Sequence, residues 1–407
     1  MRGRPFSKRS TICESSSLSG RKTDENRKNN SDERGSLPRN ARAGLRRRTA
    51  DGAPGVTEDE IRIGSTQALS GPVAAIGGPM AEGMEAYFAH VNAEGGIHGR
   101  QVNLKVADDQ FDPSTTTALT RRLVERDGVF AMVGSLGSPN VLAVMDYLND
   151  GGVPFVYQGG GATELAVPPK EYVFPFQPNY LLEGNLMVQY LVEELGHERL
   201  GVVYRAAEDG QNAYDSMMET IEMYDDAEIV EAISVEEGDT DFSTAISRFE
   251  SADVDAIMTV LFRPQSDQFL DQAYEFGLTD PTFLLTYANA DQTLIDQLGT
   301  DVMNNVRSMA WVLADFDDPD LPPWLWYADY MDEEGAVPNA YGVAGMVAAE
   351  IFTEAARRAG ENLTRDALVE ALESMDGWSG HLALDVMEVQ DGEWYPVSEW
   401  IEYKEPN

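Results

Sequence analysis

Short apolar runs alternate with amphipathic stretches along most of this chain, from about residue 61 to residue 313. Residues 129–133 and 153–158, for example, are apolar runs of strand length, a pattern typical of buried parallel strands. Between them an amphipathic segment starts at Ser138-Pro139, and serine and proline both favour the start of a helix. This alternation predicts α/β architecture, with doubly wound parallel sheets covered by helices on both faces. Strands are predicted at 61–69, 101–109, 129–133, 153–158, 172–176, 200–205, 227–235, 255–262, 282–287 and 306–313, and helices at 80–91, 113–126, from 138, and at 180–195, 213–224, 242–251, 264–276, 323–333, 339–358 and 364–375.

The strand and helix rhythm occurs twice, which predicts two similar lobes. The first lobe is expected at 58–176 and the second at 177–308, with a crossing at the sequence PFQP. Residues 309–383 are expected to return to the first lobe, and 384–407 to the second. Three connecting strands would then join the lobes, an arrangement that favours closure about a hinge.

Two glycine-rich turns follow neighbouring predicted strands. Gly134 and Gly137 precede the helix that starts at Ser138, and glycines occupy 159–161 after the next strand. Such turns leave the first N–H groups of the helix open to a small anionic or carbonyl-bearing ligand. Open α/β folds bind ligands at this carboxyl edge of the sheet, so we expect a binding site there.

Charge is distributed unevenly. The chain has 30 Lys and Arg against 70 Asp and Glu, a formal net charge of -40. Residues 1–50 contain 14 of the basic and 5 of the acidic residues, and the remainder contains only three lysines, at 105, 170 and 404. A body this acidic repels nucleic acid and anionic lipid, and salt would screen its self-repulsion, so we expect no nucleic-acid partner and an adaptation to high salt.

The first 57 residues are basic and polar, without a periodicity that could bury a face, and we expect a disordered tail. They contain the only cysteine, Cys13, so the body has no disulfide and no cysteine nucleophile. No apolar run reaches about 18 residues. The tail also lacks the apolar run of a secretory signal, so neither a signal peptide nor a lipobox is visible in the chain.

The sequence offers little support for catalysis. The four histidines occur singly, without the spacing of metal ligands. The acidic run at 315–320 lacks the glycine and the terminal glutamate of an EF-hand loop. The segments GSLGSPN and GGGATE fail the phosphate-loop and dinucleotide-loop patterns, and no G-x-S-x-G elbow surrounds the serines. We therefore expect no enzyme activity, no cofactor and no metal site.

Three segments carry a family resemblance: SGPVAAIGGPMAEGMEAYFAHVNAEGGIHGRQVNLKVADDQFDP at 70–113, then RLVERDGVFAMVGSLGSP, then VPFVYQGGGATEL. Together they resemble the type I periplasmic binding proteins of branched-chain amino acid ABC transporters, the leucine/isoleucine/valine-binding group. The similarity extends in order over about 58–375. It implies two lobes that close over a ligand, with a serine at a helix start and the backbone of the next turn holding the ligand carboxylate.

By position, that resemblance implies a ligand site with members from both lobes. Ile76 stands where a tyrosine is common, and Gly161 where a threonine is common. The acid expected for an α-amino group falls at Asp209 instead of near Tyr287. A branched-chain amino acid would suit the site, but an amide, a urea-like compound or an aromatic acid would also suit it. The implied ligand-binding residues are Ser138, Gly160, Gly161, Ala162 and Thr163 with Ile76 in the first lobe, and Asp209, Phe262 and Tyr287 in the second.

The resemblance implies an extracytoplasmic substrate-binding protein of an ABC importer, which presents its solute to membrane permease subunits. The absence of a visible signal peptide favours an alternative, a cytoplasmic amide-responsive sensor of the same fold. The salt-adapted charge, without an attached effector domain, does not favour that alternative. A third hypothesis is a doubly wound enzyme, but the sequence contains no nucleophile or cofactor motif that would support it.

Overall fold

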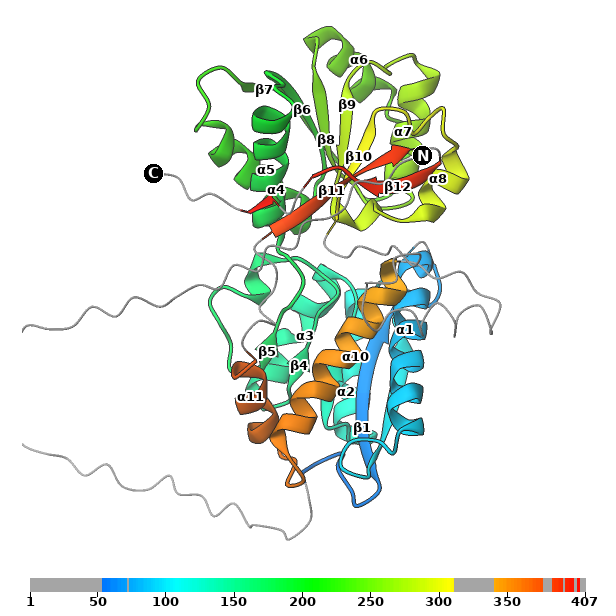
Figure 1. Ribbon diagram of the computed structural model, residues 1–407, viewed down its shortest axis with the longest axis vertical. Helices are drawn as coiled ribbons and strands as arrows, with labels where there is room; N and C mark the ends of the chain where they lie inside the picture. Colours follow the sequence, from blue (N-terminus) through cyan, green and yellow to red (C-terminus); the bar gives the residue numbers. More distant parts are fainter. Residues whose placement is uncertain are drawn as a thin grey trace, which may run out of the picture. The chain divides into compact units, whose positions relative to one another are not determined.

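The computed structural model describes residues 53–71, 73–310, 340–375, 383–390, 392–398 and 401–402. They form two α/β lobes, each built on its own sheet (Figure 1). The predicted fold class, two doubly wound lobes, is confirmed.

The first lobe has a five-stranded parallel sheet in the order β2-β1-β3-β4-β5. Alternate residues of β3 supply two cores: Ala131 and Val133 pack with the α1 and α10 helices, and Met132 packs with α3. This division is what a sheet covered on both faces requires. The strands are β1 (Glu60–Gln67), β2 (Gln101–Asp108), β3 (Ala131–Val133), β4 (Phe155–Val156) and β5 (Val173–Phe174); the helices are α1 (Ala74–Ala93), α2 (Pro113–Arg121), the π-helix Arg122–Arg126, α3 (Ser138–Asp150), the 3-10 turn Thr163–Leu165, α10 (Ala340–Ala359) and α11 (Arg365–Glu373).

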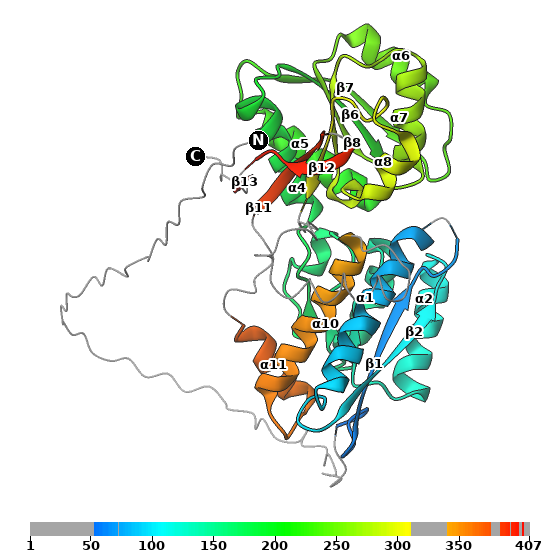
Figure 2. The same ribbon diagram turned by 45° about the vertical axis from the view of Figure 1, so that its right-hand side comes forward.

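Helices α1 and α10, far apart in the sequence, lie side by side on the first sheet (Figure 2). A Cβ atom at Gly83 would overlap the carbonyl oxygen of Gly342, and one at Gly345 would overlap that of Met80. The glycines therefore allow the two backbones to approach closely, and they fix the returning segment against the first lobe.

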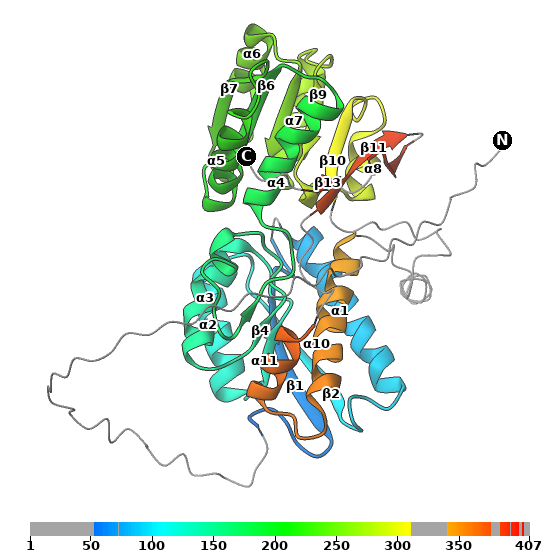
Figure 3. The ribbon, with the colours of Figure 1, turned by 60° about the vertical axis from the view of Figure 1, so that its left-hand side comes forward.

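The second lobe has an eight-stranded sheet. Its strand order is β12-β11-β10-β9-β8-β6-β7, and the eighth strand, β13, pairs with β11. The strands β6 to β10 are parallel, and β11 pairs with β10 in the antiparallel direction (Figure 3). Its strands are β6 (Arg199–Arg205), β7 (Glu228–Val235), β8 (Ala256–Val260), β9 (Thr282–Leu285), β10 (Val306–Ala310), β11 (Ala383–Gln390), β12 (Glu393–Pro396) and β13 (Ile401–Glu402); its helices are α4 (Tyr180–Gln189), the π-helix Tyr190–Glu194, α5 (Glu208–Ile221), α6 (Ser243–Ala252), α7 (Gln265–Glu275), the 3-10 turn Tyr287–Asn289 and α8 (Gln292–Leu298).

Both faces of the second sheet are covered too. Met258 of β8 packs with α4 and α5, whereas its neighbour Ile257 packs with α6, α7 and α8. The described elements change sheet three times along the chain: between β5 and α4, between β10 and α10, and between α11 and β11.

Several elements start elsewhere than the pattern predicts. Helix α1 starts at Ala74, so Ile76 and Pro79 lie in its first turns instead of in a loop. Helix α5 starts at Glu208 instead of 213, because Glu208 and Asp209 are acidic residues that suit a helix N-terminus. Helix α8 is not predicted at all.

Part of the predicted tail is also packed. Val56 bridges to Ile61, the carbonyl of Gly55 accepts a hydrogen bond from the Arg62 amide at 2.8 Å, and Ala53 and Val56 contact the first core. The remaining tail with Cys13, the end of the strand predicted at 306–313, the acidic run at 315–320 and the helix predicted at 323–333 lie outside the described residues.

Candidate functional site

Residues of both lobes line a cavity of about 240 Å³. It lies where the carboxyl ends of the strands and the starts of the following helices meet. Most of its lining is apolar, from Ile76, Met80 and Leu136 of the first lobe to Phe262 and Tyr287 of the second. Polar groups at fixed positions of the lining, such as Ser138 and Arg205, can restrict the orientation of a ligand.

Ser138 supplies the polar part of the first-lobe wall. It is the first residue of α3, and Gly137, with a φ of 96°, takes the N-cap position that the sequence favours for the serine. The Ser138 hydroxyl is buried, and it has no hydrogen-bond partner among the described residues. A buried hydroxyl without a partner is costly, so a ligand acceptor at this helix start would satisfy it.

The next turn lies behind the cavity wall. Gly159 lines the cavity, but Gly160, Gly161, Ala162 and Thr163 do not. A Cβ atom at Gly160 would stand 2.8 Å from the Ser138 Oγ atom, so this glycine lets the turn pack on the start of α3. Ala162 is buried in the core, and the Thr163 hydroxyl is buried without a partner in the described part of the chain.

Gly161 instead holds the first crossing between the lobes. Its carbonyl accepts a hydrogen bond from the Tyr180 amide at 2.8 Å. A Cβ atom there would lie 2.6 Å from the Tyr287 hydroxyl and 2.8 Å from the Pro178 carbonyl oxygen. The place of the common threonine side chain is therefore filled by the second lobe.

Arg205 and Asp209 form a buried ion pair on the second-lobe wall. Arg205 ends β6, and its Nη1 atom lies 2.6 Å from Oδ2 of Asp209, which stands in the first turn of α5. Both side chains are buried, and the Gly210 amide donates to Oδ1 of Asp209 at 2.8 Å. Burial raises the pKa of Asp209, and the positive charge of Arg205 opposes that rise. The expected acid thus already has a cationic partner.

Arg205 was not predicted as a site residue. The run LGVVYR predicts a strand. The only sign of a binding role for Arg205 is its position at the carboxyl end of a parallel strand, the edge where such sheets bind ligands. The Arg205 guanidinium carbon lies 4.9 Å from the centre of the Phe262 ring, so a cation–π contact orients it.

Three aromatic rings form one wall of the cavity. Tyr180 stacks on Tyr287 with 5.9 Å between the ring centres, and it contacts Phe262 at 6.1 Å. Burial raises the pKa of Tyr180 to about 12. Its hydroxyl is close enough to Ser138 for the serine to lower that pKa in part, although the two groups do not meet hydrogen-bond geometry. Tyr180 was missed by the sequence analysis because it looks like an ordinary first residue of a helix.

Glu183 supports this wall from behind. The side chain is completely buried on α4, and it accepts hydrogen bonds from the Tyr287 amide at 2.6 Å and from the Thr286 hydroxyl at 2.9 Å. Burial raises the pKa of Glu183 to about 8, and the two hydrogen bonds lower it in part. The Tyr287 hydroxyl in turn accepts from the Gln177 amide at 2.7 Å.

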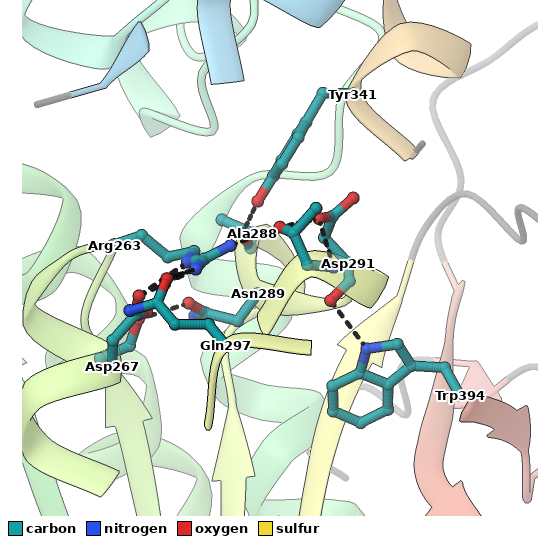
Figure 4. A network of polar contacts seen from close by, with 10 residues as sticks. Arg263, Asp267, Ala288, Asn289, Asp291, Gln297, Tyr341 and Trp394 are labelled. Atoms are coloured by element: carbon teal, nitrogen blue, oxygen red, sulfur yellow. Dashed lines mark hydrogen bonds and ion pairs between the residues drawn. The ribbon is translucent and has the colours of Figure 1, made fainter. Parts of the chain in front are cut away.

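A second network of polar contacts, drawn in Figure 4, includes Arg263 and Tyr341, which both line the cavity. Arg263 makes a forked ion pair with Asp267, with Nε to Oδ1 and Nη2 to Oδ2 both at 2.9 Å, and it also donates to Gln297. Tyr341, from α10 of the first lobe, donates its hydroxyl hydrogen bond to the carbonyl of Ala288 in the second. Burial raises the pKa of Tyr341. This contact joins the lobes at the cavity.

Five of the nine predicted site residues therefore line one cavity: Ser138, Ile76, Asp209, Phe262 and Tyr287. In the part of the chain that the structure describes, no three His, Cys, Asp or Glu side chains are placed to hold a metal. None of the described helices combines the length and apolar character needed to cross a membrane.

Comparison with known proteins gives a consistent result. Residues 60–393 match a family model described as periplasmic binding protein. The Leu/Ile/Val-binding protein of Escherichia coli (strain K12) is 26% identical over 220 residues, 54% of this chain and 59% of that protein, so the match spans somewhat over half of that relative's length. Leu/Ile/Val-binding protein homolog 8 of Brucella abortus (strain 2308) is 23% identical over 80% of this chain and 82% of that protein.

Solved structures share the fold. A branched-chain amino acid ABC transporter protein from Thermus thermophilus with bound valine superimposes with a TM-score of 0.76 at 20% identity, covering 86% of this chain and 98% of that one. A fatty acid ABC transporter substrate-binding protein from Thermomonospora curvata superimposes with a TM-score of 0.77 at 21% identity, and the match covers 87% of this chain and 95% of that one. The two proteins are named for transporters of different solutes, and at these identities the likeness establishes the fold alone.

Proposed function

The chain belongs to the periplasmic binding protein family, and on this premise we propose that it is the extracytoplasmic substrate-binding protein of an ABC importer. It would capture a small amino-acid-like solute between its two lobes, close over it by a hinge, and present it to permease subunits in the membrane. Binding, without catalysis, is the proposed activity.

The observation that carries the proposal is the cavity bounded by both lobes. Its volume of about 240 Å³ is below the roughly 300–1,000 Å³ of pockets for drug-sized ligands, so the solute must be small. At one wall the unpartnered Ser138 hydroxyl stands at the start of α3, and opposite charges attract a ligand carboxylate to a helix N-terminus. A branched-chain amino acid, an amide or an aromatic acid would each place a carboxylate or carbonyl there and its apolar part against Ile76, Phe262 and Tyr287.

Contacts between the lobes support the closing motion. Tyr341 of the first lobe bonds to the carbonyl of Ala288, and Gln177, at the first crossing, bonds to Tyr287. Both partners belong to the loop that follows β9. An open state would lose the hydrogen bond from Tyr341 to Ala288, whereas the chain connection at Gln177 would stay in place and the lobes would rotate about it.

A thermal-shift screen of amino acids, amides and aromatic acids at high salt tests this function. A solute that binds only the folded chain stabilises it by about 2.7 kcal/mol at 100 times its dissociation constant, which raises the melting temperature. Ser138→Ala should abolish most of the shift. The matched control Ser251→Ala, on the exposed face of α6, should leave it intact. Failure of every solute to raise the melting temperature, or equal shifts in both variants, would contradict the proposal.

A further inference from the structure

We propose that Arg205 selects an apolar monocarboxylate, an acid without an α-ammonium group, as the solute of this cavity. The inference rests on the proposed function and narrows its ligand class. Three features of the described residues carry it: the free donors of Arg205, the ion pair that already engages Asp209, and the presence of Ser138 on the lining of the same cavity.

The Arg205 guanidinium has donors to spare. A guanidinium carries five N–H groups, and among the described residues Arg205 uses only its Nη1 atom, toward Asp209. The side chain is 7% exposed and lines the cavity, and the ring of Phe262 lies against its face. The remaining N–H groups therefore point along the plane of the guanidinium, where a carboxylate accepts two parallel hydrogen bonds.

Asp209, in contrast, already has its charge paired with Arg205, so an ammonium group would have to share this carboxylate. One oxygen accepts from Arg205 and the other from the Gly210 amide, and the residue is 2% exposed. The other carboxylates on the cavity lining are Glu237 and Asp239, which are exposed residues of the loop after β7. An α-ammonium group that enters the cavity would lose its hydration without gaining a buried carboxylate of its own.

The polar groups of the two lobes meet at Tyr180. Its hydroxyl lies near Ser138, and its ring contacts Phe262, on which Arg205 stacks. A carboxylate at this end would take the Ser138 hydroxyl from one lobe and the Arg205 donors from the other. Apolar side chains of the first lobe, including Ile76 and Met80, also line the cavity and suit a hydrocarbon body.

Calorimetric titration of the full chain at high salt tests the inference with two matched ligand sets. The isobutyl set is 4-methylpentanoate, L-leucine and 4-methylpentanamide; the phenyl set is 3-phenylpropanoate, L-phenylalanine and 3-phenylpropanamide. In the set that binds, the acid should bind at least tenfold more tightly than the amino acid. Tighter binding of the amino acid, or no binding of either acid, would overturn the inference. The proposed function would then fail only if the wider thermal-shift screen also found no ligand.

Variants separate the role of Arg205 from a merely structural one. Arg205→Gln should weaken binding of the acid by roughly 10- to 100-fold, the loss expected for hydrogen bonds to a charged group, and change binding of the amide by less than threefold. The double variant R205Q/D209N removes both charges together, so it keeps the fold without an unpaired buried acid and should show the same selective loss. Arg199→Gln, at the exposed start of the same strand, is the control and should bind like the original chain. Equal loss of acid and amide in the double variant, or unchanged acid binding, would overturn the inference.

Discussion

The buried carboxyl of Glu183 should make the stability of this protein depend on pH in an unusual direction. Its pKa is raised from an ordinary value of 4.5 to about 8 because it is completely buried. One pKa unit corresponds to about 1.4 kcal/mol, so the group can account for at most about 5 kcal/mol of pH-dependent stability.

The sign follows from proton binding. Between pH 4.5 and 8 the folded chain keeps the Glu183 proton, whereas the unfolded chain has released it. The folded state therefore binds more protons, and the free energy of unfolding falls as the pH rises through this window. The slope should approach about 1.4 kcal/mol per pH unit near pH 6 to 7.

Urea unfolding at pH 5, 6, 7 and 8, at constant high salt, measures this slope. Glu183→Gln keeps a neutral side chain of the same length, so it should be less stable than the original chain at pH 5 but lose much less stability by pH 8. Glu250→Gln, an exposed acid on α6, controls for the general effect of removing a negative charge. If the original chain and Glu183→Gln showed the same pH slope, the argument from burial would be refuted.

Three further predictions concern packing, closure and charge. Gly161→Ala should destabilise the chain by about 1–3 kcal/mol in urea unfolding, because its Cβ atom would stand 2.6 Å from the Tyr287 hydroxyl. Gly78→Ala, where nothing lies within 4 Å, is the control and should be neutral or slightly stabilising; equal losses in both would contradict the packing argument. Tyr341→Phe should weaken solute binding several-fold in calorimetry with little change in the stability of the free chain, because it removes a hydrogen bond between the lobes; unchanged affinity would count against this closure contact. Melting temperature should rise with added salt over the molar range, since 70 acidic residues repel one another; a fall would oppose salt adaptation.

The layered fold was predictable because it depends on local patterns. Apolar runs such as 129–133 read as buried strands, and the structure places their alternate residues in the cores on the two faces of the sheet. Glycine turns marked the carboxyl edge, so Ser138 was found from the sequence. Phe262 and Tyr287 required the family resemblance, because nothing in their neighbourhood marks them as cavity residues.

The roles of the other site residues depend on contacts between residues far apart in the chain, and the sequence alone does not show these contacts. Glu183 acts on Tyr287, 104 positions away, so its burial cannot be read from an ordinary helical segment. Gly161 looks like part of a ligand turn, but the hydroxyl of Tyr287 fills the space beside it. The role of Arg205 is equally hard to read from the sequence, since only the fold brings this strand end to the cavity that Ser138 also lines.

Lobe closure around the solute is the central claim, and energy transfer between dyes on the two lobes measures it most directly. Dyes would be attached at Asp150→Cys on α3 and Glu250→Cys on α6, both exposed positions, in a chain with Cys13→Ser. Titration with the two matched ligand sets should change the transfer for at least one compound, with half of the change reached at a free ligand concentration equal to the dissociation constant found by calorimetry. Binding that leaves the transfer unchanged at saturation would contradict capture by lobe closure.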